Sequence, residues 1–151
     1  MISNDDIVRV KIHPYEFQMA KHMSKKAEVG GVSRIFPDKE ERMSRQAIDS
    51  LVGQLGTLAL TKYQMGDVQM YLLGRYMQNK FPHTGDGGED IMACNMDVKT
   101  SLKRYSFPET NYHLIVRPRE RHINNVYVHA LIEPWDESDR PKEVMLTGWA
   151  K

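Results

Sequence analysis

The chain has a single cysteine, Cys94, among its 151 residues, which excludes an internal disulfide and a cysteine-based zinc site. It has no apolar run near the roughly 18 residues that a transmembrane helix needs. Its first residues lack the basic flank and apolar core of a signal peptide. We therefore expect a cytoplasmic protein without a membrane partner. The formal net charge is only +1, and this neither indicates nor excludes nucleic-acid binding, because the placement of the charges matters more than their sum.

The order of the sequence patterns predicts one α/β domain over residues 1–151. With 40% hydrophobic residues, a chain of this length can bury a real core. Apolar residues spaced three and four apart predict three helices, over 15–28, 44–64 and 67–79. Short apolar runs, some with strict alternation, predict strands over 7–12, 90–95, 96–101, 111–118, 126–133 and 143–150. Helices followed by a run of strands favour a mixed central sheet flanked by helices.

Two glycines interrupt the strongest helical pattern. Gly53 and Gly56 lie inside the segment 44–64, and a glycine in a helix interior costs stability relative to alanine. A glycine there needs a reason, and we expect the close approach of another part of the backbone.

The stretch GDGGEDIMACNMDVKTS, residues 85–101, concentrates acidic residues, glycines and a lysine in a chain of nearly balanced charge. The glycines before Asp90 allow a sharp turn or a close approach to another group. A hairpin near Asn95 would bring Asp90 back towards Asp97. The stretch therefore predicts two neighbouring carboxylates on adjacent strands.

The pleat of the second strand divides its side chains between two faces. Met96 and Val98 point to one face, where apolar residues belong in the core, and Asp97 and Lys99 point to the other. Two close carboxylates repel one another unless a cation lies between them. Mg²⁺ prefers oxygen ligands and takes one or two carboxylates, with water and substrate phosphate completing its shell.

These groups together predict metal-assisted phosphodiester hydrolysis. Asp90 and Asp97 would hold Mg²⁺ or Mn²⁺, and the backbone carbonyl of Val98 would add a third protein oxygen. Lys99 would orient or deprotonate the attacking water and stabilise the charge that develops on the phosphate.

At these residues the sequence resembles the PD-(D/E)xK nucleases, the restriction-endonuclease-like superfamily. Asp90 matches the first acidic residue of the motif, and Asp97-Val98-Lys99 matches the second part. The phrase GDGGED is also similar to the GDGGxD phrase of type IV restriction enzymes. The resemblance implies a restriction-endonuclease-like fold, a phage or bacterial DNA endonuclease and a homodimer, because cutting two strands needs two sites.

One part of the chain departs from the superfamily pattern. Many members carry a glutamate on the helix before the sheet, in a G-x-x-G-E phrase, whereas GQLGTLAL, residues 53–60, has Thr57 in that place. Gln54, one turn earlier, or Glu16 would then position a water or the metal. The departure leaves two alternatives open: an inactive nuclease-fold protein that binds DNA or a protein, and a structure-specific junction resolvase.

A basic group follows the candidate site. Lys103, Arg104, Arg117 and Arg119 would either contact DNA phosphates beside the cleaved bond or form a solvated face. His129 lies in a pattern that faintly resembles the HNH nucleases, but the spacing and the following strand pattern favour a hydrogen-bonded histidine within a strand.

Overall fold

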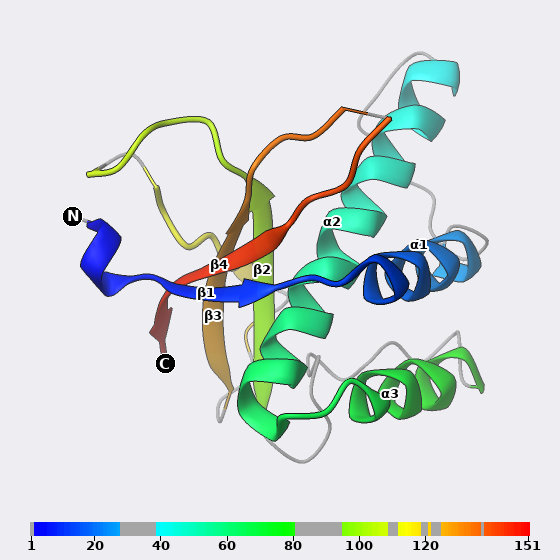
Figure 1. The fold of residues 1–151 in the computed structure, drawn as a ribbon. Coiled ribbons are helices and arrows are strands. Elements are labelled where there is room, and N and C mark those ends of the chain that lie inside the picture. Colours follow the sequence, from blue (N-terminus) through cyan, green and yellow to red (C-terminus); the bar gives the residue numbers. More distant parts are fainter. Residues whose placement is uncertain are drawn as a thin grey trace.

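Four strands form one mixed sheet in the computed structural model, which describes residues 2–27, 39–80, 95–108, 112–118, 121, 125–136 and 138–151 (Figure 1). The strands are β1 (Val8–Lys11), β2 (Met96–Leu102), β3 (Val126–Ile132) and β4 (Glu143–Ala150). Their order across the sheet is β1-β4-β3-β2. β2 pairs with β3 in parallel, whereas the β3–β4 and β1–β4 pairs are antiparallel. The strands predicted over 7–12, 96–101, 126–133 and 143–150 are confirmed.

Helices cover one face of this sheet. They are α1 (Pro14–Ala27), α2 (Lys39–Met65) and α3 (Gln69–Lys80), with a short 3₁₀ turn, η1 (Asn4–Asp6), before β1. Figure 1 shows α2 running alongside the sheet, with α1 and α3 packed on its outer side. The three predicted helices are confirmed, although α2 begins at Lys39 rather than at Ser44. None of the described helices combines the length and apolarity that a membrane crossing requires.

The core lies between α2 and the sheet. Most of its members are apolar residues that α2 presents at helical spacing and even-numbered residues of the strands, and α1 and α3 add Phe17, Ala20 and Tyr71. They include Val52, Leu55, Leu58 and Ala59 of α2, and Val10, Val98, Val128, Ala130, Ile132, Val144 and Leu146 of the sheet. The mixed α/β prediction is therefore confirmed.

Gly56 of α2 packs closely against Thr100 of β2. A Cβ atom built on Gly56 would lie 1.7 Å from Thr100 Oγ1 and 2.9 Å from Thr100 Cβ. The expected close neighbour is thus present at Gly56, and it is a strand side chain. A Cβ atom built on Gly53 would meet nothing within 4 Å, so close packing does not explain this glycine.

The predicted strand over 111–118 is wrong, since residues 112–118 form no strand. The hydroxyl of Tyr112 accepts hydrogen bonds from the backbone N–H groups of Arg104 (2.8 Å) and Tyr105 (2.7 Å), and this closes a loop after β2. The segment then crosses the sheet face opposite α2, where the ring centroids of Tyr112 and His129 lie 6.3 Å apart. Its apolar alternation reflects one side packed on the sheet and one side in solvent, without ladder pairing.

Candidate functional site

Asp97 and Lys99 form an ion pair on the sheet face opposite α2. Lys99 Nζ lies 2.8 Å from Asp97 Oδ2. Asp97 is only 5% exposed, and the Lys99 side chain is 27% exposed. Val98 between them is buried in the core on the other face, as the pleat of the strand predicts. The strand thus holds a buried carboxylate beside a lysine whose side chain is partly exposed.

The parallel register between β2 and β3 brings further polar side chains to the same face. Tyr127 is the partner of Asp97, and His129 is the partner of Lys99. His129 Nδ1 lies 2.6 Å from Thr147 Oγ1 of β4. The side chains of Tyr127, His129 and Thr147 are all buried. The hydrogen-bonded strand histidine expected from the sequence is therefore confirmed. Its position beside Lys99 was missed, because it depends on a strand register that the sequence alone does not reveal.

Burial sets the charge of His129. Desolvation lowers the pKa of this imidazole below its ordinary value of 6.5, and the nearby charge of His113 lowers it further. At neutral pH His129 is therefore an uncharged neighbour of the Asp97–Lys99 pair.

The first predicted carboxylate, Asp90, lies outside the described residues, as do Arg119 and the predicted strand over 90–95 except for its last residue, Asn95, which forms a turn. The distance between Asp90 and Asp97 therefore stays a prediction. Within the described part of the chain, no group of three or more histidine, cysteine, aspartate or glutamate side chains is placed to hold a metal ion. The predicted metal site depends on Asp90 to complete it.

Gln54 makes its hydrogen bond within the helical layer. The Tyr71 hydroxyl of α3 donates to Gln54 Oε1 at 2.6 Å. Thr57 donates its hydroxyl to the Gly53 carbonyl at 3.2 Å. α2 packs on the Val98 face of β2, so the strand backbone lies between this helix and the Asp97 side chain. A catalytic role for Gln54 stays a prediction.

Glu16, the other candidate for positioning a water or the metal, is 1% exposed at the start of α1. It accepts a hydrogen bond from the His13 N–H at 2.8 Å and pairs with Lys62 of α2 at 3.0 Å. These contacts join α1 to α2, and they give Glu16 a structural role.

The predicted DNA-contacting residues differ in their surroundings. Lys103 pairs with Glu133 and lies over the Phe107 ring, with its Nζ 4.9 Å from the ring centroid. Arg104 and Arg117 are exposed. A contact of Lys103, Arg104 or Arg117 with DNA stays a prediction.

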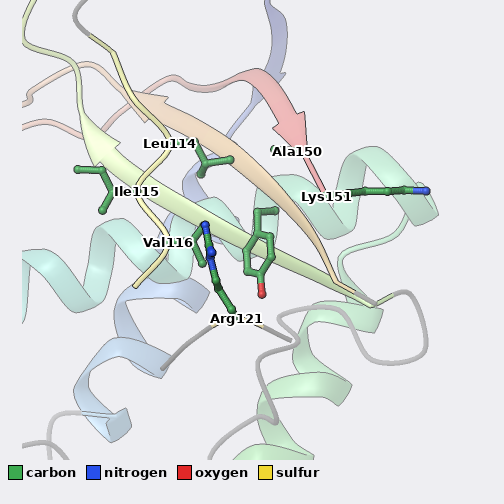
Figure 2. A pocket seen from close by; sticks show the side chains of 7 residues that line it. Leu114, Ile115, Val116, Arg121, Ala150 and Lys151 are labelled. Atoms are coloured by element: carbon green, nitrogen blue, oxygen red, sulfur yellow. The ribbon is translucent and has the colours of Figure 1, made fainter. Parts of the chain in front are cut away.

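A hollow opens on the same sheet face, one strand away from Asp97. Its volume is about 720 Å³. Figure 2 shows it between the segment that crosses the sheet and the end of β4. Among the described residues it is lined by Leu114, Ile115, Val116, Arg121, Tyr127, Ala150 and Lys151.

Comparison of the chain with protein-family models, with curated proteins and with solved structures finds no match. A buried carboxylate is a strong site for a cation, and a partly exposed ammonium beside it can contact an anionic substrate. This pairing suits reactions at phosphate.

Proposed function

We propose that the chain is a metal-dependent endonuclease with a restriction-endonuclease-like fold, which hydrolyses phosphodiester bonds in DNA. The observation that carries the proposal is the arrangement of Asp97 and Lys99, two residues apart on one face of β2 and 2.8 Å from each other. Burying a charged pair is costly unless its geometry is good. A pair retained on a buried strand face is therefore a candidate for a functional role.

The donor set fits a hard divalent cation. Asp97 supplies a carboxylate oxygen, and Asp90 and the Val98 carbonyl would supply the others, which are the ligand types that Mg²⁺ and Mn²⁺ prefer. When bound, such a cation supplies charge stabilisation at the phosphate and a more acidic water. Lys99 sits on a flexible stem, so its ammonium can leave Asp97 to contact a phosphate oxygen or the attacking water.

Lys99 and Asp97 have distinct parts in this proposal. Asp97 would hold the cation through a carboxylate oxygen. Lys99 orients the nucleophile and stabilises the negative charge that grows on the phosphate. Arg104 and Arg117 would add sequence-independent affinity for the DNA backbone.

The proposal includes a homodimer, because cleavage of both strands needs two sites. Apolar side chains stand exposed along the groove between the end of β4 and α2, among them Trp149 (71% exposed) and Tyr63 (53% exposed). Such a patch is typical of a surface that another protein chain covers. Light scattering of the purified protein gives its mass in solution, and a monomeric mass would contradict this part.

The test is cleavage of supercoiled plasmid, linear duplex and branched DNA in Mg²⁺, Mn²⁺ or EDTA. We expect metal-dependent cleavage by the parent, and a loss of about 10²- to 10⁴-fold in Lys99→Met and in Asp97→Asn. Lys142→Met is a matched control, because Lys142 also pairs with an aspartate. Its Nζ lies 2.7 Å from Asp139 Oδ1, and this pair is exposed, just before β4. This control should cleave like the parent.

Binding of Mn²⁺, followed by its electron spin resonance, separates a metal site from cleavage. Asp97→Asn and Asp90→Asn should each weaken binding, whereas Lys99→Met should not. A folded parent that neither binds Mn²⁺ nor cuts any of the three DNA substrates would refute the proposal.

One observation favours a second candidate, a nuclease-fold protein that binds DNA or a protein without cleaving. Gln54 is hydrogen-bonded to Tyr71, and Lys99 is paired with Asp97, so the polar groups expected to act on substrate have protein partners. This candidate predicts DNA binding that survives Asp97→Asn, together with no cleavage in either metal.

A further inference from the structure

The hollow on the Asp97 face is adjacent to the candidate site. Tyr127 lines the hollow and is also the register partner of Asp97 on the neighbouring strand. Neighbouring strands lie about 4.8 Å apart. A molecule that contacts Tyr127 in the hollow is therefore one strand away from the carboxylate proposed to hold the metal.

Apolar side chains form the inner part of the hollow. Figure 2 shows Leu114 and Val116 on one side of their segment and Ile115 on the other. Leu114 and Val116 are partly buried, whereas Ile115 is 74% exposed. Tyr127, from β3, adds an aromatic ring to the lining. Apolar and aromatic walls of this kind suit a flat ring, because nucleobases gain stability by stacking and by losing contact with water.

The charged residues of the hollow have one sign. Arg121 and Lys151 line it, and no acidic side chain is among its described lining residues. Figure 2 places these two cations at separate sides of the hollow. Arg121 is exposed, and its planar guanidinium group matches the geometry of a phosphate. A ligand for this hollow therefore carries both an apolar ring and negative charge.

Base-paired DNA does not offer this combination at one point. In a duplex the faces of each base are stacked on its neighbours, so a protein reaches them only after the base leaves the stack. An unpaired nucleotide presents a ring face and a phosphate together. A hollow of about 720 Å³ also lies within the roughly 300–1,000 Å³ range of small-ligand sites.

We infer that this hollow binds one unpaired nucleotide of a DNA strand. Leu114, Val116 and Tyr127 contact the base, and Arg121 and Lys151 contact the flanking phosphates. The inference deepens the proposed function and rests on it for the catalytic consequence: the preferred substrates are DNA with single-stranded overhangs, flaps or branches, held with an unpaired nucleotide beside Asp97.

Binding is measured in EDTA, so that no cleavage intervenes, by fluorescence anisotropy of a labelled single strand, a blunt duplex and a duplex with an overhang. The parent should bind the single strand and the overhang more tightly than the blunt duplex. Val116→Trp fills the hollow without a change of charge. It should weaken binding of the unpaired strands by about 5- to 150-fold, the equivalent of one stacked base, and leave the blunt duplex unchanged.

Arg121→Gln is the second variant, since an exposed arginine can be replaced without harm to folding. It should also weaken binding of the unpaired strands selectively. Arg104→Gln is the matched control: it makes the same charge change at an exposed arginine outside the hollow, and it should affect single strand and duplex alike. Equal binding of single strand and blunt duplex by the parent, or unchanged single-strand binding in both hollow variants, would overturn the inference.

Parallel cleavage assays in Mg²⁺ keep the two proposals separate. If duplex plasmid is cut but the hollow variants bind all DNA like the parent, the inference fails and the proposed endonuclease stands. If the hollow variants lose unpaired DNA selectively while the parent cuts nothing in either metal, the inference on binding stands and the catalytic proposal fails.

Discussion

At Gly56, the contact between α2 and β2 leaves no room for an added methyl group. In Gly56→Ala the new Cβ atom would meet Thr100 Oγ1 at 1.7 Å and Thr100 Cβ at 2.9 Å, if nothing moved. Rotation of Thr100 about its first side-chain bond relocates Oγ1 but leaves its Cβ in place. The helix and the strand must therefore separate, and this makes Gly56→Ala an overpacking substitution.

Gly53 allows the size of this effect to be isolated. Nothing lies within 4 Å of a Cβ atom built on Gly53, which is one turn away in the same helix. Both alanine variants gain about 0.8–1 kcal/mol of helix propensity. In Gly56→Ala, overpacking also lowers the unfolding free energy by about 1–3 kcal/mol. We therefore expect Gly53→Ala to stabilise the protein, and Gly56→Ala to be less stable than Gly53→Ala by about 1–3 kcal/mol.

Urea unfolding followed by far-ultraviolet circular dichroism measures both free energies of unfolding. The double variant Gly56→Ala/Thr100→Ala tests the cause, because it removes Oγ1 and the closest contact. It should recover part of the loss, which appears as a coupling energy in the double-mutant cycle. If Gly56→Ala is as stable as Gly53→Ala, the close packing of α2 on Thr100 is wrong.

Two further predictions concern buried ionisable groups. The folded-state pKa of His129 lies below its ordinary 6.5, so the unfolded chain binds more protons just below that pH. The unfolding free energy should thus be highest above about pH 6.5. At lower pH it should fall by at most about 1.4 kcal/mol per pH unit. Urea titrations between pH 7.5 and 5 measure this fall, and His129→Gln should flatten it. Lys62→Met should lower the unfolding free energy by about 1.5–3 kcal/mol in the same assay, because it deprives the buried Glu16 of its charged partner. Lys21→Met, at an exposed lysine, is the control. Equal losses of unfolding free energy in the two variants would contradict the buried pairing.

The sequence predicted the helices and most strands because their apolar periodicity reflects burial directly. The leucines of α2 recur at helical spacing because one side of α2 faces the sheet. The same rule failed over 111–118, where Leu114 and Val116 alternate with exposed Ile115 in a segment that lies on the sheet. Alternation records which side of a chain is covered, and a strand also needs a hydrogen-bonded neighbour. Strand order depends on long-range pairing, so the sequence did not reveal it.

The candidate site was predictable only where it is local. Asp97 and Lys99 are two residues apart on one strand, and the pleat alone places their side chains together. The neighbouring Tyr127 and His129 come from β3, about thirty residues later, and only the register brings them beside the pair. The hollow likewise joins residues from β3, β4 and the crossing segment. No local pattern marks such a combination.

The two faces of β2 make fold and site interdependent. Thr100 packs against Gly56 on the helical face, and Lys99, the preceding residue, points to the other face and pairs with Asp97. Any separation of α2 from Thr100 therefore moves the backbone that carries Lys99 and Asp97. A shift of about 1 Å at a catalytic group is enough to cost about 100-fold in rate. If the protein is the proposed endonuclease, Gly56→Ala should therefore reduce DNA cleavage by more than its loss of stability explains, whereas Gly53→Ala should cleave like the parent. Equal cleavage by the two folded variants would show that the Gly56–Thr100 contact does not hold the site in place.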